Sequence, residues 1–409
     1  MSDADHDLHR YLVGGAVRDQ LLGIEVKDRD WVVVGATPEL MIARGFLPVG
    51  KEFPVFLHPV THEEYALART ERKIRPGYRG FHVVAAPDVT LDDDLRRRDL
   101  TINALAQAMD GSVIDPFNGV SDLRNRILRH ISTAFAEDPV RVLRVARFAA
   151  RYADLGFRVA EETRALMQGM VRCGEVDALV PERIWAELES ALGEPRPSKF
   201  IEILRDCGAL ARIFPEIDIL FGIPQPARYH PEIDTGLHTM LTVDAAARSG
   251  ASTCSRFAAL VHDLGKGLTP REQWPTHRGH ERTGLEPIRA LGARLRAPKE
   301  FVRFAVSVCE HHLKMHRLET LKPTTVLRML ESIDGLHHPQ RLTDFVDACR
   351  ADTRGRTGRD TQPYPQAHLL RRCRDGALAI DCPAGLIGSA IGDEIRRRRL
   401  ATIAELLGR

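Results

Sequence analysis

The chain has 409 residues, of which 44% are apolar and 28% charged, and its formal net charge is only +2. These values are typical of folded globular proteins, exclude a disordered chain, and at this length predict two to four domains. No apolar run approaches the roughly 20 residues that a membrane-spanning helix needs, so no membrane association is expected. The seven cysteines are scattered without a CxxC pair. This argues against a disulfide framework and, with the polar N-terminus, favours a reducing cytoplasm.

The first 115 residues alternate between strand-like and turn-like segments, which predicts a small α/β region. Strands are expected at 31–35, 53–58, 64–70 and 81–87, and a helix at 38–45. The segment 71–80 combines proline, glycine and basic residues, so an exposed mobile loop is expected there.

From about residue 120 the apolar residues recur at helical spacing. The proline-rich stretch 214–232 interrupts this pattern and is predicted to be a linker. The tail from residue 365 is expected to form two or three helices, the last of them basic.

Two aspartates precede the first apolar strand of this region. Because Asp28 and Asp30 lie two residues apart, strand periodicity puts both carboxylates on one face. Such a pair can hold Mg²⁺, as in two-metal phosphoryl transfer. Glu64, which opens a neighbouring predicted strand, is the candidate for a third carboxylate, ahead of Glu63.

Glycines and arginines around these aspartates predict phosphate binding. Gly15 and the glycine before it have no side chains, so the backbone there can approach a phosphate closely. Arg18 can then bind that phosphate through two hydrogen bonds. Arg98 is placed to meet phosphate or sugar. Asp99 and Asn103, four residues apart, are expected on one face of a helix.

A helix is expected to start at "EDPVRVLRVARF", with Asp138 as N-cap and Pro139 as first helical residue. Arg141, Arg144 and Arg147 recur at intervals of three and therefore share one face of that helix. Next to a phosphate-binding region, this face is predicted to contact nucleotide.

Three motifs together, GGxVRDxLLG…DRD, RRDLTINA and EDPxRxLRxARF, resemble those of the bacterial class II tRNA nucleotidyltransferases, the CCA-adding enzymes. The likeness runs along the whole chain and includes the helical HD region of the multifunctional CCA proteins. It implies nucleotide-triphosphate binding by Gly15 and Arg18, and Mg²⁺ binding and catalysis by the carboxylates. Further implied roles are nucleotide contacts from Arg98, Arg144 and Arg147, and recognition of the base by Asp138 and Arg141.

The stretch "ALVHDLGKG" contains His262 and Asp263 and resembles the signature of HD-domain phosphohydrolases. The resemblance implies a divalent metal site that also uses His238 and a distant aspartate. Asp352 is the preferred aspartate, with Asp347 and Asp334 as competitors. Single histidines elsewhere in this region, at 277, 280, 311, 312 and 316, are expected to be mainly surface residues. Whether "CEHHLKMH" serves a second metal is left open by the spacing.

An α+β protein is therefore predicted, with a small mixed α/β nucleotidyltransferase head followed by an all-helical neck, body, HD domain and tail. The expected bounds are 1–136 for the head, 137–225 for neck and body, 236–337 for the HD domain, with an end as late as 355, and 356–409 for the basic tail.

The resemblance implies stepwise addition of CCA to the 3′ end of tRNA from CTP and ATP with Mg²⁺. It also implies hydrolysis of 2′,3′-cyclic phosphates and 2′-phosphates by the HD domain with Ni²⁺ or another divalent transition metal. A cytoplasmic location is expected, and a homodimer is one option for the assembly. The nearest rival is a poly(A) polymerase, which the HD region and the lack of a long basic C-terminal extension disfavour. A catalytically silent RNA-binding protein is the alternative from another class.

Overall fold

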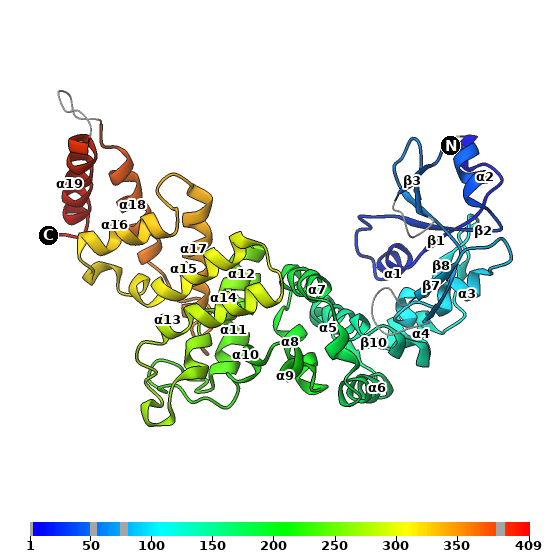
Figure 1. Ribbon diagram of the computed structural model, residues 1–409, viewed down its shortest axis with the longest axis horizontal. Coiled ribbons are helices and arrows are strands. Elements are labelled where there is room, and N and C mark those ends of the chain that lie inside the picture. Colours follow the sequence, from blue (N-terminus) through cyan, green and yellow to red (C-terminus); the bar gives the residue numbers. More distant parts are fainter. Residues whose placement is uncertain (1–2, 50–54, 74–80, 382–388) are drawn as a thin grey trace. The chain divides into compact units, whose positions relative to one another are not determined.

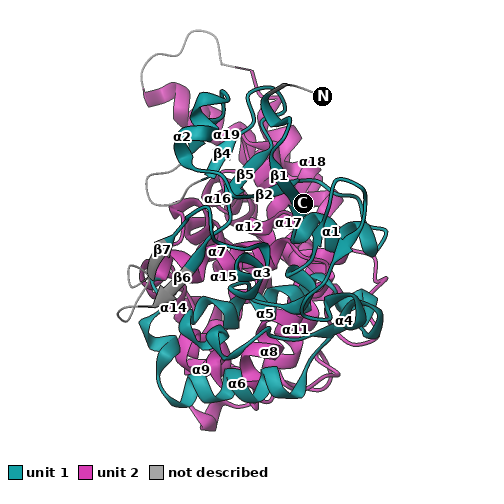
Figure 2. Ribbon diagram, turned by 90° about the vertical axis from the view of Figure 1, so that its right-hand side faces the viewer, with its two compact units in different colours: residues 1–180 teal, residues 181–409 magenta. Residues whose placement is uncertain are grey.

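The computed structural model describes residues 3–49, 55–73, 81–381 and 389–409. It divides into two compact units, residues 1–180 and 181–409, which Figure 2 shows in teal and magenta. Every described strand lies in the first unit, and the described residues of the second unit form helices joined by loops (Figure 1).

The first unit is built on a mixed sheet of seven strands. Only the pair β2–β5 is parallel, and the other neighbouring strands run antiparallel. In spatial order the strands are β3 (Leu47–Val49), β4 (Val55–Leu57), β5 (Glu64–Leu67), β2 (Asp30–Val34), β1 (His9–Val13), β8 (Ala106–Gln107) and β9 (Val113–Ile114).

Both faces of this sheet are covered, which explains the continuous apolar run of β2. Val32 belongs to a buried cluster that includes Leu95, while the next residue, Val33, packs in a second cluster with Met41. Because neighbouring strand residues point to opposite faces, the two clusters fill the two sides of the sheet. Asp30 shares its face with Val32, two residues further along β2.

Helices and two small strand pairs complete the first unit. Strand β6 (Thr70–Lys73) pairs antiparallel with β7 (Phe81–Val84), and β10 (Ile127–Leu128) pairs parallel with β11 (Arg158–Val159). The α-helices are α1 (Gly15–Leu21), α2 (Pro38–Ala43), α3 (Leu91–Arg96), α4 (Gly119–Asn125), α5 (Val140–Arg151) and α6 (Glu161–Arg172).

The second unit packs α12 against α11, α15 and α17. Its helices are α7 (Pro181–Gly193), α8 (Ser198–Asp206), α9 (Ala209–Ile213), α10 (Pro215–Asp218), α11 (Thr235–Arg248), α12 (Thr253–Val261), α13 (His280–Thr283), α14 (Leu285–Arg294), α15 (Lys299–Met315), α16 (Pro323–Ser332), α17 (Pro339–Arg354), α18 (Gln366–Leu378) and α19 (Ser389–Leu406). None of the helices in the described part of the chain has the length and apolar character needed to cross a membrane.

The predicted head elements are confirmed with shorter bounds, because β2, α2, β4, β5 and β7 lie where strands and a helix were expected. The predicted loop at 71–80 is wrong for residues 71–73, which belong to β6, and its remainder, 74–80, lies outside the described residues. The proline-rich stretch is not a simple linker, since it contains α10 and buries Phe214, Ile217 and Leu220.

Two local predictions also need correction. Helix α5 begins at Val140, one residue later than expected. Asp99 and Asn103 do not share an α-helix, because Leu100 is extended and a short 3-10 turn follows at Thr101–Asn103. Their side chains still meet, with Asn103 Nδ2 donating to Asp99 Oδ1 at 2.8 Å.

Candidate active sites

Asp30 and Glu64 face each other at the start of the two parallel strands of the head. Asp30 on β2 is the direct register partner of Glu64 on β5. Register partners point to the same side of a sheet, so both carboxylates leave on one face. Glu63 lies on the other face, where its Oε2 accepts a hydrogen bond from Trp31 Nε1 at 3.0 Å.

Asp28 lies just before β2, close enough to act on Asp30 electrostatically. Desolvation raises the pKa of Asp30, the charge of Asp28 raises it further, and Arg98 opposes both effects. Both aspartates and Glu64 are exposed. In the described part of the chain, these carboxylates do not come within 4.8 Å of one another as a group of three.

Arg98 lies against the backbone at Gly14. Gly14 has a φ of +64°, a conformation that favours glycine, and a Cβ there would meet Arg98 Nη1 at 2.7 Å and displace the guanidinium. Arg98 Nη2 donates to Asp94 Oδ2 at 3.1 Å, while its buried Nε has no hydrogen-bond partner. The arginine is therefore fixed beside the glycine turn that leads into α1.

Arg18, on α1, is buried inside the head. Its Nε donates to Asp19 Oδ1 at 2.8 Å, and its guanidinium also donates to the side chain of Asn103. The guanidinium carbon lies 5.2 Å from the ring centroids of both Phe148 and Tyr152. These contacts tie α1 to the C-terminal end of α5 through a cation beside two stacked aromatic rings.

Arg144 and Arg147 on α5 have different partners, Asp99 before the helix and Phe148 on the helix itself. Arg144 Nε donates to Asp99 Oδ2 at 2.6 Å. Although desolvation acts to raise the pKa of Asp99, Arg144 and the hydrogen bond from Asn103 outweigh it and lower that pKa to about 2. Arg147 lies over the ring of Phe148, 4.7 Å from its centroid.

Asp138 lies two residues before α5, and Arg141 is in the first turn of that helix. Asp138 Oδ1 accepts a hydrogen bond from the Val140 amide at 3.1 Å. Arg141 donates to the Ala134 carbonyl at 3.0 Å and to the Arg97 carbonyl at 2.5 Å. Arg141 therefore contacts the backbone next to Arg98, so the residues predicted to read the base adjoin one predicted to bind nucleotide.

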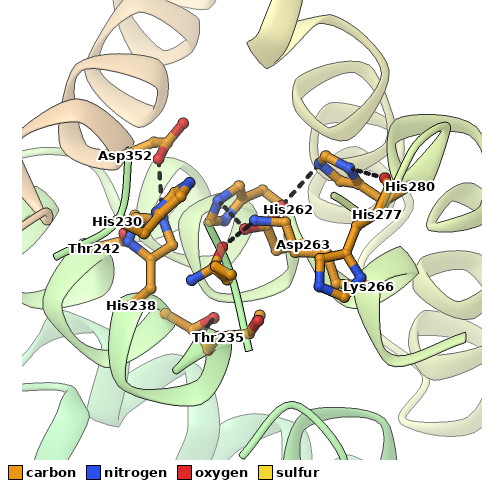
Figure 3. Close-up of polar contacts among 12 residues, drawn as sticks. His230, Thr235, His238, Thr242, His262, Asp263, Lys266, His277, His280 and Asp352 are labelled. Carbon is orange, nitrogen blue, oxygen red and sulfur yellow. Dashed lines mark hydrogen bonds and ion pairs between the residues drawn. The ribbon is translucent and has the colours of Figure 1, made fainter. Parts of the chain in front are cut away.

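The second unit contains a buried cluster of imidazoles and carboxylates (Figure 3). His238 Nε2 lies 3.0 Å from Asp352 Oδ1, and His262 Nε2 lies 3.2 Å from Asp263 Oδ2. Their exposed fractions are 0% for His238, 2% for His262, 1% for Asp263 and 3% for Asp352. Asp352 is thus the one among the three candidate aspartates that lies in the cluster, since Asp347 pairs with Arg350 and Asp334 with His338.

Two further histidines, His280 on α13 and His312 on α15, also belong to this cluster. In each of the groups His238–His262–Asp263, His262–His312–Asp352 and Asp263–His280–His312, the potential ligand atoms lie within 4.8 Å of one another. The expectation that the additional histidines are surface residues is wrong for four of them: His277, His280, His311 and His312 are buried. Of these four, His277 and His311 face away, toward the Pro224 carbonyl and Ser332.

Hydrogen bonds to the backbone orient three of the imidazoles. In each case Nδ1 donates, at 2.8 Å, to the carbonyl of the residue three positions earlier, so that Nε2 presents its lone pair to the cluster. The pairs are His262 with Ala259, His280 with His277, and His312 with Cys309.

Charged neighbours surround the cluster. Lys266 Nζ lies 2.6 Å from Asp263 Oδ2, and Arg356 Nη2 lies 3.3 Å from Asp352 Oδ1. Although both aspartates are desolvated, the adjacent cations and imidazoles hold their pKa values well below the usual range. Both carboxylates are therefore ionised and can act as ligands at neutral pH.

The cluster fits a divalent transition metal ion. Asp263 Oδ1 and the Nε2 atoms of His262 and His280 are buried without hydrogen-bond partners, which is costly unless another group satisfies them. Imidazole nitrogens mixed with carboxylate oxygens suit such ions. Glu232 supplies an outer contact, because its Oε1 lies 2.8 Å from His238 Nδ1.

Comparison with known proteins identifies the family. A curated relative in Methylococcus capsulatus, named Multifunctional CCA protein, is 59% identical over 401 residues, covering 97% of this chain and 94% of the relative. A relative of the same name in Thioalkalivibrio sulfidiphilus is 59% identical over 400 residues, covering 97% of this chain and 98% of the relative. The chain belongs to the multifunctional CCA protein family.

Family models match three segments of the chain. Residues 10–129 match the poly A polymerase head domain, residues 156–220 match a probable RNA and SrmB-binding site of polymerase A, and residues 236–352 match the HD domain. The HD match contains all of the buried cluster's predicted ligands.

Solved structures share this fold. A CCA-adding enzyme in an apo form has a TM-score of 0.68 at 21% identity, covering 98% of this chain and 89% of that one. A tRNA nucleotidyltransferase complexed with a primer tRNA and an incoming ATP analog has a TM-score of 0.55 at 25% identity, covering 84% of this chain and 91% of that one.

Proposed function

We propose that this chain is a nucleotidyltransferase that adds C, C and A to the 3′ end of tRNA from CTP and ATP, and that its HD domain is a phosphohydrolase. Membership in the multifunctional CCA protein family carries this assignment. The register pairing of Asp30 with Glu64 beside Arg98 supports the head as the site of nucleotide transfer.

In the head, the 3′ hydroxyl of tRNA attacks the α-phosphate of the nucleotide, and pyrophosphate leaves. Asp28, Asp30 and Glu64 would hold Mg²⁺, which supplies hydroxyl activation and charge neutralisation when bound. Gly15 and Arg18 would bind the triphosphate. Further nucleotide contacts would come from Arg98, Arg144 and Arg147. Positioning and charge neutralisation account for most of such catalysis.

Asp138 and Arg141 would choose the base. Cytosine and adenine each present an exocyclic amino donor next to a ring-nitrogen acceptor, which matches an aspartate acceptor beside an arginine donor. Uracil and guanine do not offer that pattern. Contact of Arg141 with the backbone next to Arg98 supports a base-reading site beside the nucleotide contacts.

In the HD domain, His238, His262, Asp263 and Asp352 would hold Ni²⁺ or another divalent transition metal ion. When bound, it supplies activated water for attack on a phosphate ester. The proposed substrates are 2′,3′-cyclic phosphates and 2′-phosphates at tRNA ends. The unpartnered buried atoms of the cluster support this use.

The proposed domains are a head at 1–136, a neck and body at 137–225, an HD domain at 236–337, with an end as late as 355, and a basic tail at 356–409. The proposed partners are tRNA, bound through its backbone and duplex shape, and the two nucleotides. A cytoplasmic location and a homodimer are also proposed.

Labelled CTP incorporation into tRNA that lacks its 3′ CCA tests the head assignment. We expect incorporation by the unaltered chain and its loss in Asp28→Ala. Equal incorporation by both would favour a silent RNA-binding protein with a contaminating activity. For the HD domain, phosphate release from a 2′,3′-cyclic nucleotide should fail in His262→Ala, and unaltered release would overturn the assignment.

A further inference from the structure

Asp352 receives contacts on both of its carboxylate oxygens. Oδ1 lies 3.0 Å from His238 Nε2, a contact that Figure 3 shows. Oδ2 lies 2.6 Å from Nε2 of His316, the C-cap residue of α15. Arg356 Nη2 is more distant, at 3.3 Å from Oδ1 and 3.5 Å from Oδ2. His316 therefore makes the shortest of these contacts with the carboxylate.

The proton positions on His316 follow from its two neighbours. An ionised carboxylate can only accept, so the Nε2 atom carries a proton and donates to Asp352. In a neutral imidazole the other nitrogen is then an acceptor. Nδ1 lies 3.0 Å from the hydroxyl of Tyr364, and burial raises the pKa of that hydroxyl, so it keeps a proton to donate. A chain of hydrogen bonds thus runs from Tyr364 through His316 to Asp352.

Several contacts fix the imidazole of His316 in this orientation. The ring of Tyr364 packs against it edge to face, with centroids 5.8 Å apart. Gln366 Nε2 donates to the backbone carbonyl of His316 at 3.4 Å. The hydroxyl of Thr353 lies 3.5 Å from His316 Nδ1, farther away than the hydroxyl of Tyr364. A side chain held in one orientation can hold its hydrogen-bond partner in turn.

His316 itself does not lie among the potential metal ligands. Within the described residues, it belongs to none of the groups whose potential ligand atoms all lie within 4.8 Å of one another. Asp352 does belong to such a group, with His262 and His312. His316 therefore acts on the cluster through Asp352. Carboxylates that bind metals are in general held by hydrogen bonds of this kind.

We propose that His316 and Tyr364 are positioning residues of the HD site. Tyr364 donates to His316, and His316 donates to Asp352 Oδ2, which leaves Oδ1 directed toward His238. The inference rests on the proposed function of the HD domain, in which Asp352 is a metal ligand. Tyr364 lies beyond residues 236–352, the segment that matches the HD domain model, so the chain after that segment also contributes to the site.

Binding of Co²⁺ to the metal-stripped full chain tests the role of His316. The parent carries Asp28→Ala and Asp30→Ala, so that the head carboxylates do not compete for the ion, and chelator competition measures the affinity. His316→Ala should weaken binding by about 10- to 100-fold. His316→Gln should recover most of this loss, because its amide N–H can donate to Asp352 in place of the imidazole. The visible spectrum of Co²⁺ bound to the glutamine variant should match that of the parent, because no ligand has changed.

A double-mutant cycle tests the role of Tyr364. Tyr364→Phe removes only the hydroxyl and should also weaken Co²⁺ binding. Added to His316→Ala, it should cause no further loss, because Tyr364 acts through His316. If His316→Ala does not match the parent's circular dichroism, His316→Leu replaces it, since leucine fills a similar volume without a donor.

The matched control is His311→Gln. His311 is buried on α15, but its Nε2 contacts Ser332 Oγ at 2.6 Å outside the cluster. This variant should bind Co²⁺ as tightly as the parent does.

Unchanged affinity in Tyr364→Phe, or losses that add in the double variant, would overturn the proposed chain. A His316→Gln variant that binds as weakly as His316→Ala, or that has an altered Co²⁺ spectrum, would overturn the positioning role of His316. The result is separable from the phosphohydrolase assignment. The expected losses of affinity in a chain that releases no phosphate from a 2′,3′-cyclic nucleotide contradict only the assigned activity. Phosphate release by a chain whose Co²⁺ affinity is insensitive to these substitutions contradicts only the positioning role.

Discussion

Asp30 and Glu64 are direct partners in the parallel pairing of β2 with β5, so their carboxylates leave the sheet on the same face. Glu63, one residue earlier, turns to the opposite face and accepts a hydrogen bond from Trp31. Of these two adjacent glutamates, Glu64 can therefore act together with Asp30, whereas Glu63 cannot. Substitution of each glutamate tests this difference.

Replacing Asp30 by Asn or Glu64 by Gln should reduce incorporation of both CTP and ATP. Loss of an outer-shell contact costs about 10- to 100-fold, so loss of a metal-binding carboxylate should cost at least that much. Glu63→Gln serves as the control and should stay near the activity of the unaltered chain. Initial rates with each labelled nucleotide give the comparison, and equal losses in the Glu63 and Glu64 variants would contradict the assignment.

Replacing Arg141 by Ala should first affect which base is added. Loss of a bidentate contact to a base lowers the preference for the correct base over a wrong one by roughly 10- to 100-fold. Competition of CTP with UTP measures this ratio, and Arg124→Ala, an exposed position on α4, controls for the loss of a positive charge. An unchanged ratio with a lower rate would assign Arg141 to positioning instead of base choice.

Asp99 should contribute pH-dependent stability. Its pKa is lowered to about 2 in the folded chain, so its stabilisation is present above its unfolded value near pH 4 and is lost as pH falls toward 2. At neutral pH this contribution is roughly 2 kcal/mol. Asp99→Asn should therefore unfold at lower urea concentration at pH 7, with a difference that narrows below pH 4. A difference independent of pH would show that the ion pair with Arg144 is not its cause.

Glu232 should strengthen metal binding at the HD site without being a ligand there. Its carboxylate contacts Nδ1 of His238, whose Nε2 faces Asp352. Glu232→Gln should weaken binding of Ni²⁺ by about 10- to 100-fold in chelator competition. Asp347→Asn, whose parent carboxylate pairs with Arg350 outside the cluster, is the matched control. Equal affinities in the two variants would remove Glu232 from the site.

Much of the head was predictable from sequence because the residues that define its strands and motifs lie close together in the chain. Gly14 and the aspartates around β2 are close in the chain, and alternating or continuous apolar runs bounded by glycine and proline define the strands. The predicted loop at 71–73 failed because pairing with β7, which begins eight residues after Lys73, makes these charged residues a strand despite their turn-like composition.

The histidine cluster was only partly predictable. His262 and Asp263 form a local motif, but His280 and His312 join them only because α15 packs against α12 and α13 packs against α15. The sequence did contain one pattern that indicates a shared position: His312 and His316 lie four residues apart and therefore share a helix face. His311 lies on another face, and its side chain contacts Ser332. Both His312 and His316 reach the cluster, with His316 Nε2 lying 2.6 Å from Asp352 Oδ2.

Sequencing the 3′ ends of tRNA after incubation with the chain, CTP and ATP together tests the central claim most directly. The substrate is tRNA that ends one position before the first C. We predict that nearly all extended molecules end in CCA and that extension then stops. Runs of A without C, or ends that keep growing past the final A, would contradict the claim.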